Sequence, residues 1–278
     1  MIYIVGNTKG GSGKSFIGNH ILPAYLYLRK GQEETLLYEF DEHSRTSQDY
    51  LQNSPSVKSQ IIKEDQIQEE VFNVRFSSKT EDVIIDVGAG HLLGKIVKEA
   101  ELAFKMDELV FVVPYSDDSL YSLQETIASI EKYVENPKIV IVINRLSIQD
   151  NTLESAKDVA IDLFGSKRYS IKPSSILKDI EKYVKSAISE VHILTVFART
   201  EKVSMIDMYK NYLAVEGLDD DELENVWKAR GAIKGEKATR EEFVREYVLI
   251  QHHLEVKNFL DSLTEFYDSL DSFNTKKK

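Results

Sequence analysis

Cysteine is absent from the 278 residues of the chain. Without thiols the protein can form no disulfide framework, no iron–sulfur cluster and no cysteine-ligated zinc site. Long hydrophobic runs are missing as well, because no stretch approaches the roughly 20 apolar residues of a membrane span. The opening apolar run, Ile2–Val5, is too short for a signal peptide. We therefore expect a cytoplasmic protein.

Positive charge is also in short supply. The chain has 35 Lys and Arg against 46 Asp and Glu, which gives a formal net charge of −11. Affinity for a polyanion depends largely on phosphate neutralisation by Lys and Arg, so the balance argues against a general attraction to nucleic acid. Only local basic patches could provide one. The length suffices for one large α/β domain with a helical appendix.

Five short runs rich in valine and isoleucine predict strands that are buried on both faces. They are Ile2–Val5, Thr35–Phe40, Val83–Val87, Leu109–Pro114 and Ile139–Asn144. Between the fourth and fifth runs, apolar residues recur at three- and four-residue steps over 120–134, as on an amphipathic helix. Alternating strands and helices predict an α/β fold with a doubly wound, mostly parallel sheet.

Two further helices are expected, one over 152–164 and one after the sequence KPSS at 172–175. On the second helix, apolar residues at 177, 180, 184 and 188 would share one face. The segment 47–80 is polar and has no clear period, so helical pieces and loops are expected there.

A glycine-rich sequence, KGGSGKS at Lys9–Ser15, follows the first expected strand and opens a helix. Backbone N–H groups in such a loop can point at phosphate oxygens, aided by the helix dipole. Here these groups belong to Gly10, Gly11, Ser12 and Gly13. Lys14 would reach the β- and γ-phosphates, and the Ser15 hydroxyl would complete a Mg²⁺ shell. The usual pattern G-x4-G-K-[ST] begins with glycine, whereas this chain has Thr8 at that position.

The loop resembles the deviant Walker A motif, K-G-G-x-G-K-[ST], of the ParA/MinD family of P-loop ATPases. In that family the first motif lysine, here Lys9, reaches across a nucleotide-sandwich dimer to the phosphates bound by the other subunit. A cation placed in this way stabilises charge on the transferring phosphoryl group, as an arginine finger does. The resemblance therefore implies an ATPase that binds Mg-ATP, dimerises on the nucleotide and hydrolyses ATP slowly.

Two acidic segments resemble further motifs of the family. In "YEFDEH" the resemblance makes Asp41 the residue that orients the attacking water or helps to hold the metal, with Glu39 where the family usually has aspartate. In "VIIDVGAG" it makes Asp86 a Mg²⁺ ligand through water and Gly90 a backbone sensor of the γ-phosphate. The family often has proline where this chain has Gly88.

The sequence "IVIVINR" ends in Asn144 and Arg145, and it resembles the segment whose asparagine reads the adenine edge. GTP-specific relatives have [NT]-K-x-D at this point, so its absence favours ATP. Pro173 lies where family members close over the base and is expected beside the nucleotide. The resemblance covers about residues 1–200, which we interpret as a P-loop ATPase domain, and leaves 201–278 as a helical extension.

The extension carries a capping-box signature, Thr239 with Glu242. From Leu249 to Phe273 apolar residues alternate steps of three and four, which predicts a helix over 240–272 with a heptad-like seam. Two interpretations fit the seam: packing onto the ATPase domain, or contact with a partner helix. Acidic residues on the polar side of this helix argue against stable association with an anionic membrane.

The absence of cysteine excludes the members of the superfamily that carry iron–sulfur clusters or use cysteine pairs. Partition ATPases of the family bind DNA non-specifically and act with a ParB-like partner that stimulates hydrolysis. Lys178, Lys182 and Lys185 would share a narrow arc of the helix after KPSS and could contact DNA phosphates. The resemblance thus favours plasmid or chromosome partition, and nucleoid association if DNA is bound.

Two alternatives remain open. The same ATPase could position or mobilise a protein complex, such as a conjugation apparatus. A small-molecule P-loop ligase, resembling dethiobiotin synthetase, would share the phosphate loop but turn over rapidly with its substrate.

Overall fold

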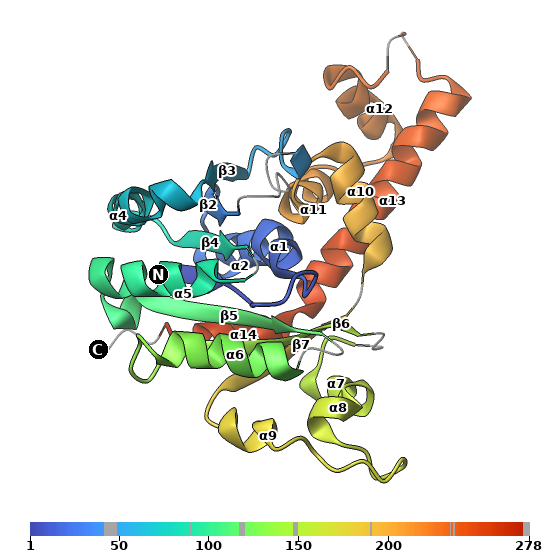
Figure 1. Ribbon diagram of the computed structural model, residues 1–278. Coiled ribbons are helices and arrows are strands. Elements are labelled where there is room, and N and C mark those ends of the chain that lie inside the picture. Colours follow the sequence, from blue (N-terminus) through green and yellow to red (C-terminus); the bar gives the residue numbers. More distant parts are fainter. Residues whose placement is uncertain are drawn as a thin grey trace.

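The computed structural model describes residues 1–41, 49–88, 90–116, 120–146, 150–189, 191–233, 235 and 237–274. Seven strands of this part form one sheet in the order β3-β2-β4-β1-β5-β6-β7, and every pairing is parallel (Figure 1). The strands are β1 Ile2–Val5, β2 Thr35–Phe40, β3 Val57–Ile62, β4 Val83–Val87, β5 Leu109–Tyr115, β6 Ile139–Leu146 and β7 Val184–Ser189. The predicted doubly wound α/β fold and its five strands are confirmed.

The two strands that sequence reasoning missed, β3 and β7, lie at the edges of the sheet. An edge strand is covered less completely, so it lacks the unbroken apolar run that marks a central strand. In β3 the residues between the buried ends Val57 and Ile62 are exposed or half-buried.

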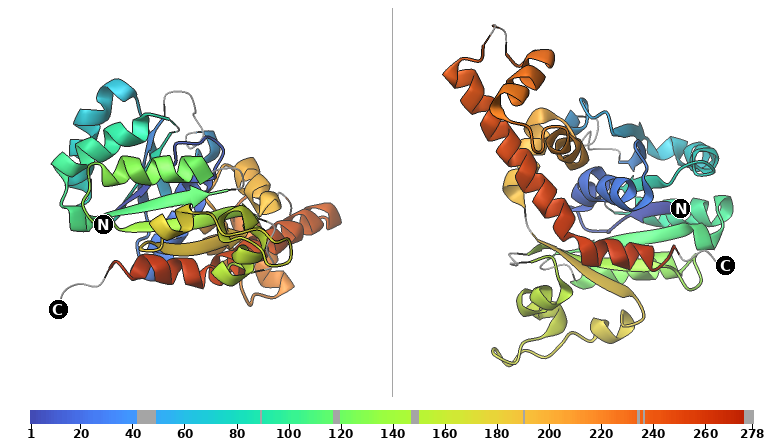
Figure 2. Two further views of the ribbon diagram at one scale, coloured as in Figure 1. Left: turned by 60° about the horizontal axis from the view of Figure 1, so that its bottom comes forward. Right: turned by 180° about the vertical axis from the view of Figure 1, so that it is seen from behind.

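Two helical layers cover the two faces of the sheet (Figure 2). Side chains of β1 alternate between the layers, with Ile2 and Ile4 in one core and Tyr3 and Val5 in the other. The first layer contains α4 Ile67–Ser77, α5 Leu92–Ala103, α6 Leu120–Glu131, α7 Leu153–Val159, α8 Ile161–Phe164 and α9 Ile176–Asp179. The second contains α1 Lys14–Phe16, α2 Leu22–Lys30, α10 His192–Glu201, α11 Met205–Leu213 and α14 Thr264–Asp271, together with the end of α13 Arg240–Ser262.

One turn of π-helix, Ile17–Ile21, joins α1 to α2, and Pro23 explains why. Proline has no N–H, so the carbonyl of Asn19, four residues earlier, loses its helical donor. The Ser204 hydroxyl donates a hydrogen bond of 2.7 Å to this carbonyl instead. The helix after the phosphate loop is thereby tied to the start of α11.

The helices after residue 200 belong partly to the sheet and partly to a projecting arm. Figure 1 shows α12, Asp220–Ala229, and the first half of α13 standing away from the sheet. A small separate core around Trp227 holds these two helices together. The Trp227 and Phe243 rings meet edge to face with their centroids 5.2 Å apart.

The predicted single helix over 240–272 is interrupted, since α13 ends at Ser262 and α14 begins at Thr264. The seam residues Val256, Phe259, Leu263, Phe266 and Leu270 are all buried in the second layer's core. Packing onto the body of the protein is therefore the correct interpretation for this part of the seam.

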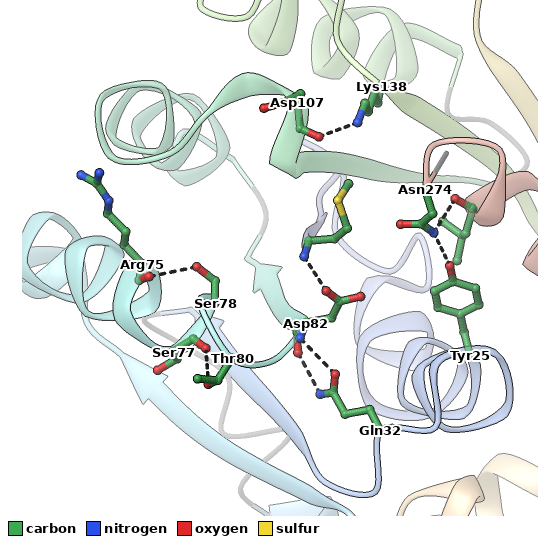
Figure 3. Close-up of polar contacts among 12 residues, drawn as sticks. Tyr25, Gln32, Arg75, Ser77, Ser78, Thr80, Asp82, Asp107, Lys138 and Asn274 are labelled. Atoms are coloured by element: carbon green, nitrogen blue, oxygen red, sulfur yellow. Dashed lines mark hydrogen bonds and ion pairs between the residues drawn. The ribbon is translucent and has the colours of Figure 1, made fainter. Parts of the chain in front are cut away.

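Polar contacts join the helices to the end of the sheet opposite the phosphate loop, where the strands begin (Figure 3). The Gln32 amide exchanges two hydrogen bonds with the backbone of Asp82, of 2.9 and 3.0 Å. Tyr25 of α2 donates to Asp271 of α14 and accepts from Asn274, at 2.8 and 2.7 Å. The carboxyl-terminal helix is thus bound to the helix that follows the phosphate loop.

Two helix predictions need correction. The helix expected over 152–164 is broken at Ala160 into α7 and α8. The helix expected after KPSS is wrong: α9 has only four residues, and Val184–Ser189 forms β7. Apolar residues of an edge strand there happened to fall at helical spacing, and tertiary pairing with β6 decided the outcome. Within the described ranges no helix is both long and apolar enough to cross a membrane.

Candidate nucleotide site

The phosphate loop follows the central strand β1, whose connection runs to β2 on one side, whereas the connection of its neighbour β5 runs to β6 on the other. Ligands of open α/β sheets bind at such a switch point, beyond the carboxyl ends of the strands. Within the loop Gly11 and Gly13 have φ angles of 73° and 98°. Side chains other than glycine rarely adopt these angles, so both glycines are required for the loop's shape.

Neighbouring strands hold the loop in place. The Asn7 amide donates to the Pro114 carbonyl of β5 at 2.7 Å, and Asn7 Oδ1 accepts from the Lys9 N–H at 2.7 Å. Buried Asn144, at the end of β6, donates to the Ser12 carbonyl at 3.2 Å. The predicted adenine reader therefore also supports the loop.

The side chain of Lys14 is buried and held by a hydrogen bond to the loop. It is 8% exposed, and its Nζ donates to the Lys9 carbonyl at 3.0 Å. The ammonium group is thus held within the loop, against the position that the phosphates of a nucleotide would occupy. The two lysines of the motif are linked through this backbone contact.

Three carboxylates form the opposite side of the site. Glu39 of β2 and Asp86 of β4 are register partners on adjacent strands, both buried, and Asp41 follows β2. Burial, assisted by the nearby charge of Glu39, raises the pKa of Asp86 from 3.8 to about 7, against the opposing effect of Lys14. The Ser15 hydroxyl hydrogen bonds to Asp86.

The chemistry of this group fits Mg²⁺. Asp86 Oδ1 is buried and has no hydrogen-bond partner within the described residues, although an unpaired buried carboxylate oxygen is costly. Mg²⁺ prefers hard oxygen ligands and is usually held by one or two carboxylates, water and substrate phosphates. Asp86 and Ser15 would hold the ion, with Asp41 beside them. In the described part of the chain no group of three or more His, Asp or Glu side chains is arranged to hold a metal ion.

The segment after β4 is bound to the end of β2 by its backbone. The Gly88 N–H donates to the Phe40 carbonyl at 2.7 Å. A Cβ at position 88 would lie 3.0 Å from Asp41 Cγ, closer than ordinary contact. Proline at position 88 would lose this hydrogen bond, because it has no N–H, and its Cβ would crowd Asp41.

Gly90 has a φ angle of 84°, and its N–H donates to the Thr8 carbonyl at 3.1 Å. The predicted γ-phosphate sensor is therefore next to the phosphate loop. To contact a phosphate, its N–H would exchange the Thr8 carbonyl for a phosphate oxygen.

A cavity of about 320 Å³ joins the loop to the carboxylates. Among the predicted site residues it is lined by Gly10, Gly11, Gly13, Lys14, Ser15, Asp41 and Asp86. Sequence reasoning missed further lining residues, namely Phe16, Asn19, His20, Tyr50, Thr195 and Arg199. They come from the helix after the loop, from the chain before β3 and from α10, and no motif marks them.

A second cavity of about 250 Å³ lies at the end of β6. Its lining includes Asn144, with Phe16, Ser189, Val191, His192, Thr195 and Arg199. The cavity has the place expected for a base, and the segment that closes it follows β7.

Some predicted residues are not brought to the cavities. Pro173 is exposed between α8 and α9, where its nitrogen packs near Gly165, so it does not line either cavity. The backbone of Arg145 belongs to β6, but its side chain lies outside the described part. Lys9 and Ser12 belong to the loop without lining either cavity.

The expected lysine stripe is wrong, because its helix does not exist. Lys178 lies in α9, whereas Lys182 follows it in a turn and forms an ion pair with Glu131 at 2.6 Å. Lys185 lies in β7, and its Nζ donates to the carbonyls of Ile180 and Tyr183 at 2.8 and 2.9 Å. Burial lowers the pKa of Lys185.

A parallel sheet with a phosphate loop after its central strand, and a buried aspartate on the adjacent strand, defines an α/β protein of the P-loop nucleoside-triphosphatase class. Residues 1–135, just under half of the chain, match the family model described as ATPase MipZ. The match confirms the resemblance to ParA/MinD-like ATPases over the part that carries the loop and Asp86.

Among solved structures, a plasmid partition protein from Borrelia burgdorferi is similar at 15% identity and a TM-score of 0.44. The similarity covers 72% of this chain and 96% of that one. No curated protein sequence gives a significant match.

Proposed function

We propose that the protein is a ParA-like ATPase that binds Mg-ATP, pairs with a second copy around two nucleotides and hydrolyses ATP slowly as a switch. The observation that carries the proposal is the juxtaposition of Lys14 with buried Asp86, whose Oδ1 lacks a partner, across one cavity. That arrangement supports a phosphate and a divalent cation side by side. In the proposed dimer Lys9 contacts the partner subunit's nucleotide, and Asp41 orients the attacking water.

Light scattering coupled to size exclusion tests the proposal. Wild type is expected to be a monomer without nucleotide and a dimer with Mg-ATP, and Asp41→Ala is expected to stay dimeric because hydrolysis is blocked. Lys9→Ala should still bind ATP yet remain monomeric, whereas Lys132→Ala, an exposed lysine on the ring of Tyr133, should behave as wild type. A Lys9→Ala protein that dimerises normally would refute the role of Lys9.

The cargo that we propose first is DNA, moved in partition together with a ParB-like partner that stimulates hydrolysis. Support comes from the family match alone, since Lys182 is paired and Lys185 is occupied by backbone carbonyls. ATP-dependent retention of non-specific DNA by the Asp41→Ala protein would support this role.

The same two lysines, with the net charge of −11, favour a second candidate. In this candidate the same switch positions a protein complex, and no DNA is retained in any nucleotide state. A small-molecule ligase would differ from both by rapid turnover with its substrate and by needing no Lys9 in trans.

A further inference from the structure

The two cavities of the nucleotide site meet at three residues. Phe16, Thr195 and Arg199 line both of them. If the proposed function is correct, the phosphates lie in the first cavity and the base lies in the second, beside Asn144. The part of the nucleotide that joins them, the ribose and its nearest phosphate, must then pass these three residues.

Helix α10 supplies two of the three. Thr195 and Arg199 are one turn apart and therefore lie on the same face of the helix. The Arg199 guanidinium lies over the ring of Tyr50, 4.4 Å from its centroid. This stacking holds the cation at the point where the cavities join.

The first cavity is rich in negative charge, which Arg199 would balance. Its lining includes the carboxylates Glu39, Asp41 and Asp86, whereas Lys14 and Arg199 are the lysine and arginine side chains in the described lining of the two cavities. A bound polyphosphate adds further negative charge. Lys14 is held inside the loop, so a second cation is needed toward the base.

The neighbouring His20 does not supply this second positive charge. His20 is buried, and its Nδ1 accepts a hydrogen bond from the Met205 N–H at 3.3 Å. Burial, with Arg199 nearby, lowers the pKa of His20 to about 4. His20 is therefore neutral at physiological pH, and Arg199 carries the charge on this side.

We propose that Arg199 is a positioning residue for nucleoside di- and triphosphates, whose guanidinium binds the phosphate next to the ribose. Arginine suits this place because its planar group stacks on Tyr50 while its N–H donors face a phosphate. The inference deepens the proposed function, and it assigns a residue of α10 to a site otherwise built from the loop and strand ends.

Nucleotide affinity tests the inference. Dissociation constants for ATP, ADP and adenosine are measured by calorimetry on wild type, Arg199→Ala and Arg199→Lys. A lost charge-assisted hydrogen bond corresponds to roughly a tenfold to hundredfold weaker binding. We expect that loss for ATP and ADP alike in Arg199→Ala, little change for adenosine, and partial recovery in Arg199→Lys.

Arg168→Ala is the matched control, because Arg168 also lies over a tyrosine ring, Tyr169, at 5.5 Å, but outside both cavities. It should bind all three ligands as wild type does. Thermal unfolding without nucleotide checks that each variant is folded.

Three outcomes overturn the inference. The first is unchanged ADP and ATP affinity in folded Arg199→Ala, and the second is a loss confined to ATP, which would move the contact to the terminal phosphate. The third is equal loss for adenosine, which would indicate a merely structural role. Failure of the proposed function looks different, because wild type and Lys14→Ala would then bind ATP equally poorly.

Discussion

The Asp86→Asn substitution should stabilise the nucleotide-free protein at neutral and alkaline pH while abolishing the proposed binding of Mg²⁺. Asp86 is 3% exposed, its Oδ1 lacks a partner within the described residues, and buried Glu39 is its register partner on β2. Asparagine has nearly the same shape and no charge. The substitution therefore removes an unfavourable buried charge without leaving a cavity.

The size of the effect follows from the pKa of Asp86, which is raised from 3.8 to about 7 in the folded protein. A carboxyl group with a raised folded pKa is favoured while protonated, so the folded state loses stability as the pH rises from about 4 to about 7. Each pKa unit corresponds to about 1.4 kcal/mol, and three units give at most about 4 kcal/mol. The variant should lack this loss.

Urea unfolding followed by circular dichroism at pH 5, 6, 7 and 8, without Mg²⁺ or nucleotide, measures the effect. The advantage of Asp86→Asn in the free energy of unfolding should grow with pH and approach 4 kcal/mol at pH 8 as an upper limit. Asp65→Asn is the control, since Asp65 is exposed, and its effect should stay within about 0.5 kcal/mol at every pH.

Mg-ATP should reduce the stability advantage of Asp86→Asn over wild type. A ligand that binds only the folded state at a hundred times its dissociation constant adds about 2.7 kcal/mol of stability. Wild type should gain this, and Asp86→Asn should not. The reasoning is refuted if, without Mg²⁺ or nucleotide, the stability difference between the two proteins is the same at pH 5 and pH 8, or if the variant is the less stable at pH 8.

Three further predictions concern the framework of the site. Ser204→Ala should lower the free energy of unfolding by roughly 1–3 kcal/mol, because the buried carbonyl of Asn19 loses its donor. In a Pro23→Ala background the loss should be smaller, because alanine at position 23 has an N–H that can bond to this carbonyl. Additive effects in the double-mutant cycle would contradict this prediction. Fluorescence of Trp227, the single tryptophan, should change at lower urea than the circular dichroism signal, because its small core is separate from the sheet; coincident curves would argue against an independent arm. Gly88→Pro should be less stable than Gly88→Ala by roughly 1–3 kcal/mol, because only proline loses the N–H bonded to Phe40, and equal unfolding midpoints would disprove it.

Much of the site could be read along the chain because it is local. The phosphate loop lies within Lys9–Ser15, and its glycines and lysine act through the backbone and the helix that directly follow. Asp86 could be placed because it lies near the end of a strand so apolar that burial on both faces was expected. These features depend on residues that are close together in the chain, so a sequence pattern is enough to predict them.

The base side of the site was decided by tertiary structure. Pro173 was expected there, yet the closing segment follows β7, an edge strand whose sequence matched a helical spacing. Arg199 and Tyr50 are 149 positions apart and meet only through the tertiary structure, in which α10 packs against α11 and α13.

The sequence by itself determined the class of the fold and the phosphate half of the site. Unbroken apolar runs form strands that helices must cover on both faces, and a glycine-rich loop before a helix presents its N–H groups to phosphate. Tertiary structure decided the edges of the sheet, the break in the carboxyl-terminal helix and the partners of the lysines. Those features depend on which surfaces pack against each other. The pattern of polar and apolar residues along the chain does not specify this packing for a half-covered strand, or for a lysine that has several possible partners.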